Sequence, residues 1–269
     1  MPPRRRSVLG SDALGKKIYF FYPPGWLKEE MIKDLIENEY EAYAVDDHRL
    51  LFPLLRSSSA SIIFINIDSG PEELEWEKYV RIIRDSELRE KVQVGILSNN
   101  NSKPLVEKYV SELKTEAGYI ILRQRTQDVS KAIYPVLSKL GAKGRRRFLR
   151  AECSDSGKAT FNISFKGNAY GGRILDISSA GMACYFDDDR IMLSVGDMLP
   201  DIQLRLVGKV TTVSGRIVGV RQDAHRVYVV LFDEKTSYAA REKIHSFVYY
   251  SLSHNMNRML SELSSSVKS

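Results

Sequence analysis

The sequence predicts a two-domain protein with an α/β first half and an all-β second half that ends in a helix. Residues 16–140 alternate short apolar runs with stretches of helical period. After residue 141 the pattern changes to closely spaced strand-like runs separated by turn residues. The length of 269 residues suits two domains. We therefore expect a disordered basic tail at 1–15, a first domain at 16–140 and a second at 141–269.

The first domain is expected to contain five β-α units. The expected strands are residues 18–22, 43–45, 62–65, 92–97 and 119–122. The apolar run 62–65 is typical of a central parallel strand buried on both faces. Helices are expected near 27–36, 50–55, 76–83, 105–113 and 129–140, and Pro135 should kink the last one. Right-handed crossovers then give a doubly wound sheet of flavodoxin-like topology.

The second domain is expected to be a small β-barrel. Its predicted strands are residues 159–165, 173–177, 182–186, 202–206, 209–220 and 226–232. Gly171-Gly172 favours a bulge or turn before the second of them. Ser138 to Gly144 has the composition of a short flexible linker. From about Tyr238 a helical apolar face predicts a terminal helix that packs on either domain, with a coiled-coil dimer as the alternative.

Composition narrows the function classes. No apolar run approaches the roughly 20 residues of a membrane-spanning helix, and the N-terminus lacks a secretory h-region, so we expect a cytoplasmic protein. Cys153 and Cys184 lie in no metal-ligand spacing. No nucleophile-base arrangement or useful carboxylate pair is evident, so we expect no enzyme activity, no metal and no cofactor.

The positive charge has two possible explanations. The net charge of +6 and a pI of about 9.1 are compatible with nucleic-acid binding. The excess is concentrated in Arg4-Arg5-Arg6 and between Lys143 and Arg150, without the spacing of a helix-turn-helix or a zinc finger. A solvated tail and an anionic small ligand account for these clusters better, and nucleic-acid binding is kept as an alternative.

Two short motifs suggest that ligand. Arg146 and Arg150 lie four residues apart, and Asp176, Ser178 and Gly181 follow as D-x-S-x-x-G. Guanidinium groups bind phosphate oxygens and the O6/N7 edge of guanine with two parallel hydrogen bonds. A carboxylate accepts from guanine N–H groups, a hydroxyl donates to phosphate, and a glycine permits close backbone approach.

Together the motifs resemble the PilZ family of receptors for the bacterial second messenger cyclic di-GMP, over residues 144–250. The resemblance implies ligand contacts from Arg146, Arg150, Asp176, Ser178 and Gly181. An arginine at position 145 resembles members that bind an intercalated ligand dimer, so one or two ligands per chain are both open. Asp176 and Ser178 could also cap a tight turn, and Gly181 could supply a positive φ. Arg216 and Arg221 are either auxiliary phosphate contacts or surface ladder residues.

The first domain is similar in architecture to response-regulator receivers, but its chemistry departs from theirs. Tyr22-Pro23-Pro24-Gly25 stands where receivers carry an acidic pair. Asn66 stands at the phosphoacceptor position and Arg123 where a lysine is usual, while Ser98 keeps the hydroxyl. Asp46, Asp47 and Asp68 are interpreted as solvated loop acids. We expect a pseudo-receiver that serves as a protein-interaction scaffold.

The expected function is a cyclic di-GMP receptor that changes its interdomain arrangement on binding and signals to a protein partner. The flexible arginine segment at the domain junction would become ordered over the ligand. A phosphorylation-controlled response regulator and a basic nucleic-acid-binding protein are the alternatives. The sequence identifies neither the partner nor the oligomeric state.

Overall fold

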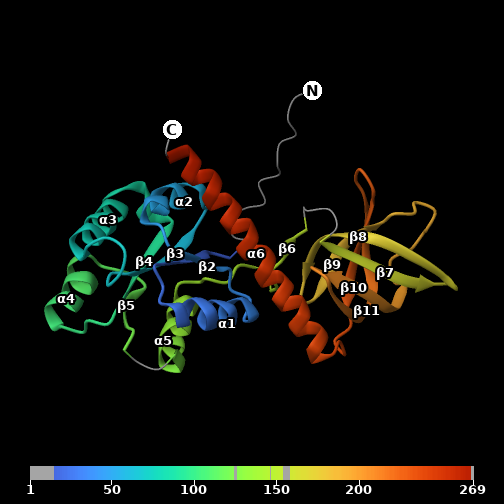
Figure 1. Cartoon of the computed structure of the whole chain (residues 1–269), viewed down its shortest axis with the longest axis horizontal. Coiled ribbons are helices and arrows are strands. Elements are labelled where there is room, and N and C mark those ends of the chain that lie inside the picture. The colour runs from blue at the N-terminus through green and yellow to red at the C-terminus, as the bar shows by residue number, and fades with distance from the viewer. Residues whose placement is uncertain (1–14, 124–125, 146, 154–157, 268–269) are drawn as a thin grey trace. The chain divides into compact units, whose positions relative to one another are not determined.

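The computed structural model describes residues 15–123, 126–145, 147–153 and 158–267. The chain divides into two compact units, one reaching to Arg147 and including the residues from Arg258 onward, the other spanning Phe148–Asn257 (Figure 1). The expected basic tail lies outside the described residues except for Gly15. Each unit is described by itself.

The first unit contains a five-stranded parallel sheet. Its strands are β1 (Lys17–Phe21), β2 (Ala42–Val45), β3 (Ser61–Asn66), β4 (Val92–Ser98) and β5 (Gly118–Ile121). The strand order β2-β1-β3-β4-β5 is the flavodoxin-like order, which confirms the predicted doubly wound fold. All six residues of the central strand β3 are buried, as its continuous apolar sequence predicts.

Helices cover both faces of this sheet. The α-helices are α1 (Ile32–Glu37), α2 (Leu51–Ser57), α3 (Glu73–Asp85), α4 (Lys103–Glu107) and α5 (Thr126–Lys139). Short π-helices precede α1 (η2, Leu27–Met31) and continue α4 (η5, Lys108–Glu112). Short 3-10 helices precede α2 (η3, His48–Leu50) and follow α3 (η4, Glu87–Glu90). In Figure 1, α1 and α5 lie on one side of the sheet and α2 and α3 on the other. The hydroxyl of Tyr134 donates to Asp34 at 2.6 Å and joins α5 to α1.

Part of the predicted flexible linker, Ser138 to Gly144, belongs to the first unit. Ser138 and Lys139 complete the last turn of α5, which continues through Pro135. Ala142 is buried, and its carbonyl accepts from the backbone N–H of Lys16 at 2.8 Å. The chain is therefore held in the first unit as far as Ala142, because this edge hydrogen bond fixes the backbone beyond the helix.

The second unit is an antiparallel barrel followed by a helix. Its strands are β6 (Ala151–Glu152), β7 (Ala159–Phe165), β8 (Asn168–Ser178), β9 (Gly181–Phe186), β10 (Met198–Leu206), β11 (Lys209–Gln222) and β12 (Arg226–Phe232). The order β6-β8-β7-β10-β11-β12-β9 closes because β8 also pairs with β9. Phe161, Phe186 and Tyr228 form edge-to-face contacts in the barrel core. The predicted all-β barrel is confirmed.

Strand β8 begins five residues earlier than predicted, and the bulge or turn expected at Gly171-Gly172 is wrong. Both glycines lie inside β8, where Gly171 pairs with Asn162 and Gly172 with Phe161. The turn occurs at Lys166-Gly167, both of which have positive φ. Glycine is required at 172 because a Cβ there would lie 2.3 Å from the carbonyl oxygen of Tyr185.

The terminal helix α6 (Tyr238–Val267) starts where predicted and runs longer. Within the second unit its apolar residues Ile244, Phe247 and Val248 are buried. Lys243 Nζ donates to the carbonyl of Val210 at 2.9 Å, which joins the helix to β11. No helix in the part of the chain that the structure describes has both the length and the apolar character needed to cross a membrane.

Candidate functional site

The short strand β6 brings the two sequence motifs together. Ala151 pairs with Ile177 and Glu152 with Asp176, and the backbone N–H of Cys153 donates to the carbonyl of Leu175 at 2.8 Å. Arg150 comes immediately before β6. The pairing therefore holds its side chain beside the end of β8, 26 positions further along the sequence.

Arg150 and Asp176 form a direct ion pair. Arg150 Nη1 donates to Asp176 Oδ1 at 2.9 Å, and the two side chains are 48% and 24% exposed. An arginine carries five N–H donors and a carboxylate about four acceptor sites. A contact through one nitrogen and one oxygen leaves most of this capacity available, and both groups are accessible to an anionic or purine ligand.

The second motif spans a tight hairpin. Asp176 and Ser178 are the last alternating residues of β8, Ser179-Ala180 form the turn, and Gly181 opens β9. Ser178 pairs with Gly181, and its Oγ donates to the Gly181 carbonyl at 3.2 Å. Ser178 is only 4% exposed, so its hydroxyl stabilises the hairpin. Asp176 lies in β8, within the strand predicted at 173–177, and β8 continues as far as Ser178.

Gly181 is required by the packing of β9 against β12. Its φ is not in the positive range. Among the described glycines, those with positive φ are Gly70, Gly118, Gly141, Gly167, Gly196 and Gly208. A Cβ on Gly181 would lie 2.2 Å from the carbonyl oxygen of Val230 in β12. Glycine at this position therefore permits β9 to approach β12 closely, and the positive-φ explanation is wrong.

The remaining predicted contacts lie in different places. Arg145 is exposed on the segment before β6, and Arg146 lies outside the described residues. Arg216 is exposed on β11. Arg221, further along the same strand, pairs with Asp223 at 3.1 Å, which supports the surface-ladder interpretation for that residue.

Both cysteines lie close to this site and are held as thiols. Burial, together with the carboxylates of Asp176 and Glu152, raises the pKa of Cys153 to about 12. Burial, with a smaller effect of Asp176, also raises the pKa of Cys184. A thiol in such surroundings is a poor nucleophile and a poor metal ligand, so these cysteines act as small apolar residues here.

The carboxyl edge of the first unit's sheet is closed by hydrogen bonds among its own residues. Asn66 Nδ2 donates to the carbonyl of Tyr22 at 2.8 Å, and Asn66 Oδ1 accepts from the backbone N–H of Asp68 at 3.2 Å. Asp68 accepts from Ser98 Oγ at 2.6 Å and from Asn99 Nδ2 at 2.9 Å. Asp68 is exposed, in agreement with its interpretation as a solvated loop acid, and its carboxylate also accepts hydrogen bonds from the end of β4 and the loop that follows.

The other two acids at this edge are also paired. Asp46 accepts from Lys28 at 2.6 Å, and Asp47 accepts from Arg49 at 2.7 Å. The side-chain hydrogen bond from Arg49 lowers the pKa of Asp47. Within the described ranges, no three His, Cys, Asp or Glu side chains gather as a metal site would require.

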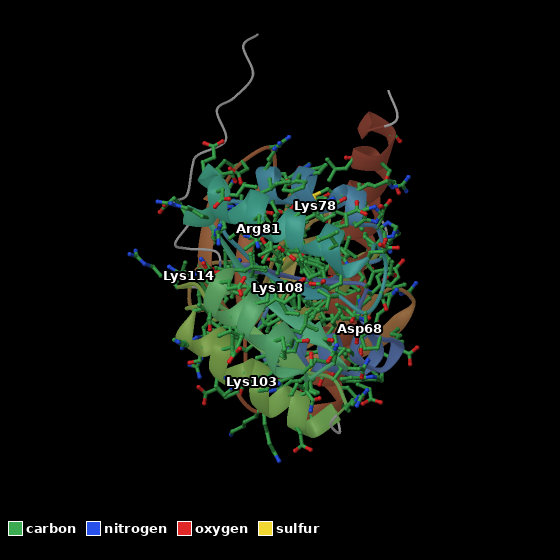
Figure 2. The ribbon with its side chains drawn as sticks, turned by 90° about the vertical axis from the view of Figure 1, so that its left-hand side faces the viewer. Asp68, Lys78, Arg81, Lys103, Lys108 and Lys114 are labelled. Carbon is green, nitrogen blue, oxygen red and sulfur yellow. The ribbon has the colours of Figure 1, made fainter. Side chains whose placement is uncertain are left out.

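Two of the basic side chains on one face of the first unit pair with acids. Figure 2 shows Lys78, Arg81 and Lys108 over α3 and the α4–η5 segment. Lys108 lies 2.8 Å from Glu73 and 3.0 Å from Glu77, and Arg81 pairs with Glu77 at 2.6 Å. The face therefore has mixed charge, unlike the continuous basic surface that tracks a nucleic-acid backbone.

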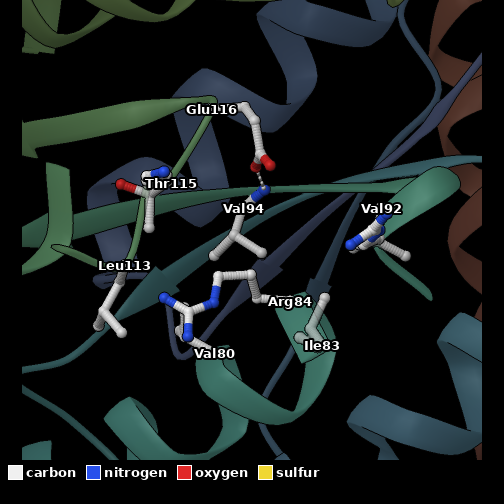
Figure 3. Close-up of a pocket in the computed structure, with 10 residues that line it drawn as sticks. Val80, Ile83, Arg84, Val92, Val94, Leu113, Thr115 and Glu116 are labelled. Atoms are coloured by element: carbon white, nitrogen blue, oxygen red, sulfur yellow. Dashed lines mark hydrogen bonds between the residues drawn. The ribbon is translucent and has the colours of Figure 1, made fainter. Parts of the chain in front are cut away.

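A small hollow also opens in the first unit (Figure 3). It is lined by the apolar side chains of Val80, Val94 and Leu113 and by Arg84. Glu116 Oε2 accepts from the backbone N–H of Val94 at 3.2 Å. The space of about 10 Å³ holds at most one water molecule, so the hollow is too small for a nucleotide.

Comparison with known proteins finds similar structures for the barrel region. No family model matches the sequence, and no curated protein matches it. The PilZ domain of YcgR from Escherichia coli with c-di-GMP has 13% identity and a TM-score of 0.38, covering 44% of this chain and 98% of that one. The MrkH–c-di-GMP complex of K. pneumonia has 19% identity and a TM-score of 0.35, covering 40% and 52%.

A third similar structure is the inhibitor of motility MotI/DgrA of Bacillus subtilis, with 15% identity and a TM-score of 0.34, covering 42% of this chain and 52% of that one. The chain thus spans about half the length of MrkH and of MotI. The architecture of each unit follows from the strand order of this chain alone.

Proposed function

We propose that this chain is a non-catalytic receptor for cyclic di-GMP. The contact between Arg150 and Asp176 carries the proposal, because it joins two motifs that are far apart in sequence. An RxxxR segment and a D-x-S-x-x-G hairpin are of little use to a common ligand unless they meet. Two of the similar structures contain this ligand.

The proposed chemistry uses the free capacity of the ion pair. Arg150 turns its unused N–H donors to a phosphate or to the O6/N7 edge of guanine, while Asp176 accepts from guanine N–H groups. Ser178 keeps the hairpin closed, so these groups are positioned before the ligand arrives. Micromolar affinity corresponds to about −8 kcal/mol, which several charge-assisted hydrogen bonds can supply after ordering costs.

The arginines before Arg150 complete the proposed site. Arg146 supplies the second guanidinium of the RxxxR motif, and Arg145 stacks on a guanine face. If Arg145 stacks in this way, two ligands bind per chain as an intercalated dimer. Without it, a single ligand binds.

We further propose that binding changes the interdomain arrangement. The segment from Arg145 to Arg150 connects the two units in sequence, and its charges repel one another until an anion neutralises them. The first unit then presents a surface to a protein partner and receives no phosphoryl group, since the amide of Asn66 stands at the position of the acceptor. Small-angle scattering with and without ligand tests the rearrangement, and unchanged profiles at saturation would refute it.

The binding experiment is isothermal titration of the whole chain with cyclic di-GMP, with GTP and cyclic di-AMP as control ligands. Selective saturable binding is expected, and its stoichiometry of one or two reports on Arg145. No heat and no thermal shift with cyclic di-GMP would refute the receptor proposal.

Variants connect the binding to the site. Arg150→Ala and Asp176→Ala should both abolish measurable binding and leave the circular dichroism spectrum unchanged. Arg190→Ala is the matched control, because Arg190 also pairs with an aspartate, Asp188, at 2.8 Å in the same unit and is fully exposed. If both variants bind cyclic di-GMP with wild-type affinity, the assignment of Arg150 and Asp176 to the binding site is refuted, even though the unaltered protein binds the ligand.

A further inference from the structure

A single row of paired residues crosses the outside of the barrel from the candidate site. Ser178 in β8 pairs with Gly181 in β9, Gly181 with Leu231 in β12, and Leu231 with Arg216 in β11. Directly paired residues of antiparallel strands point to the same face of a sheet. With neighbouring strands about 4.8 Å apart, the row spans roughly 14 Å from Ser178 to Arg216.

At Leu231 and Arg216 the row lies on the outer face of the barrel, whereas Ser178 at its start is buried. The residues on either side of Leu231, Val230 and Phe232, are buried, whereas the side chain of Leu231 is 39% exposed. On β11 the neighbours Gly215 and Ile217 likewise pair with the inward residues Phe232 and Val230, so Arg216 points outward. The side chains of Leu231 and Arg216 thus emerge on the same side as the Ser178–Gly181 pair.

The middle of the row is a low, apolar strip. Gly181 has no side chain, and it cannot acquire one because of the Val230 carbonyl. Next to it, Leu231 presents exposed aliphatic surface. A flat aromatic ring can lie over such a strip and bury apolar area without displacing any side chain.

Charged groups occupy both ends of the strip. At one end is the Arg150–Asp176 pair, in which Asp176 lies on β8, the strand that carries Ser178. At the other end, Arg216 is exposed and forms no ion pair or side-chain hydrogen bond with any described residue. An unpaired guanidinium can be redirected without breaking an existing ion pair, and all of its donors are available to an incoming anion.

We propose that Arg216 is a second anion-binding residue of this site, so that a ligand with two phosphates is held from both sides of the Gly181–Leu231 strip. The inference rests on the proposed function and extends it. A cyclic dinucleotide has two phosphodiesters on opposite sides of its ring, and each guanine is flat. One phosphate meets Arg150, a guanine lies over Gly181 and Leu231, and the other phosphate meets Arg216.

The test is titration of the whole chain with cyclic di-GMP in two variants, Arg216→Ala and Arg216→Glu. Loss of a charge-assisted contact should weaken binding about 10- to 100-fold in the first, and reversal of charge should weaken it further in the second. Arg205→Ala and Arg205→Glu are the matched controls. Arg205 is also exposed, on β10, and its variants change the net charge by the same amounts, but it pairs with Val210, outside the row.

The outcomes separate the two proposals. Absence of binding by the unaltered chain would overturn the receptor function itself. If the unaltered chain binds, Arg150→Ala abolishes binding and both Arg216 variants keep wild-type affinity, the inference about Arg216 alone is overturned. Equal weakening in the Arg205 and Arg216 variants would also overturn it, because the effect would then be general attraction of an anion by a basic protein.

Discussion

Replacement of Gly181 by alanine should destabilise the barrel through a contact with its own backbone. The added Cβ would lie 2.2 Å from the carbonyl oxygen of Val230 and 3.2 Å from its carbonyl carbon. Non-bonded atoms prefer about 3.5–4.0 Å, so β9 and β12 must separate by more than 1 Å. The obstacle is backbone, which cannot rotate away as a side chain would.

The expected magnitude is at the upper part of the range for overpacking, about 2–3 kcal/mol in the free energy of unfolding. Separation of the strands also weakens the hydrogen bond from the N–H of Phe232 to the carbonyl of Ala180, which is 2.8 Å long. For a unit of this size, the loss corresponds to a fall of roughly 8–12 °C in melting temperature.

The assay can assign the effect to one unit. Both tryptophans of the chain, Trp26 and Trp76, belong to the first unit. Tryptophan fluorescence therefore follows the first unit, while calorimetry follows both. We expect the calorimetric transition of the barrel to move to lower temperature and the fluorescence transition to stay unchanged.

Gly219→Ala is the matched control. Gly219 lies on β11, its φ is not in the positive range, and a Cβ there would meet Val229 at an ordinary 3.6 Å. This variant should keep or slightly raise the stability, because alanine restricts the unfolded chain more than glycine does. A barrel transition in Gly181→Ala that matches the one in Gly219→Ala would refute the reasoning.

Three further predictions concern the site, the cysteines and the first unit. Arg150→Ala should lower the free energy of unfolding by less than about 1 kcal/mol in urea titrations, because its ion pair with Asp176 is partly exposed, and a larger loss would contradict a binding role without a structural one. Burial raises the pKa of Cys153 from 9.0 to about 12, so above about pH 9 the unfolded chain loses this proton and the folded chain keeps it. The free energy of unfolding should therefore be constant below about pH 9 and fall above it by up to about 1.4 kcal/mol per pH unit. Cys153→Ala should flatten this fall between pH 9 and 11, and an identical slope in the variant would contradict the assignment to Cys153. Asn66→Asp removes the donor to the carbonyl of Tyr22 and should cost about 1–3 kcal/mol in the fluorescence transition without permitting labelling by acetyl phosphate, whereas labelling would favour the response-regulator alternative.

The sequence predicts most of the fold because the parallel strands are apolar over almost their whole length, while the barrel strands alternate apolar and polar residues. The five parallel strands and the later antiparallel ones except β6 were expected, most of them within two residues of their observed ends. The start of β8 was missed because Asn168 to Gly172 contains polar residues and two glycines, which are poor strand formers in isolation. Close packing against β9 makes the second glycine necessary there, and this requirement appears only in three dimensions.

The candidate site was predictable as a set of residues but not as an arrangement. The residue types and spacing indicate an anionic guanine ligand, yet the contact between Arg150 and Asp176 depends on β6, which has only two residues. Periodicity cannot detect so short a strand. The positive φ considered for Gly181 was wrong, and the hydrogen bonds of Asp68 were missed. Both depend on a strand or loop that is distant in sequence.

The brevity of β6 has a kinetic consequence. A strand held by two residue pairs and the Cys153 amide opens at a small free-energy cost, so its amides should exchange with deuterium well before those of β8 or β12. A ligand that binds only the closed form slows this exchange by a factor of 1 + [L]/Kd. The deuterium exchange rate of the Cys153 amide would then report the fraction of the chain that has ligand bound. Without ligand, the same rate would show how often β6, and with it Arg150, is paired with β8.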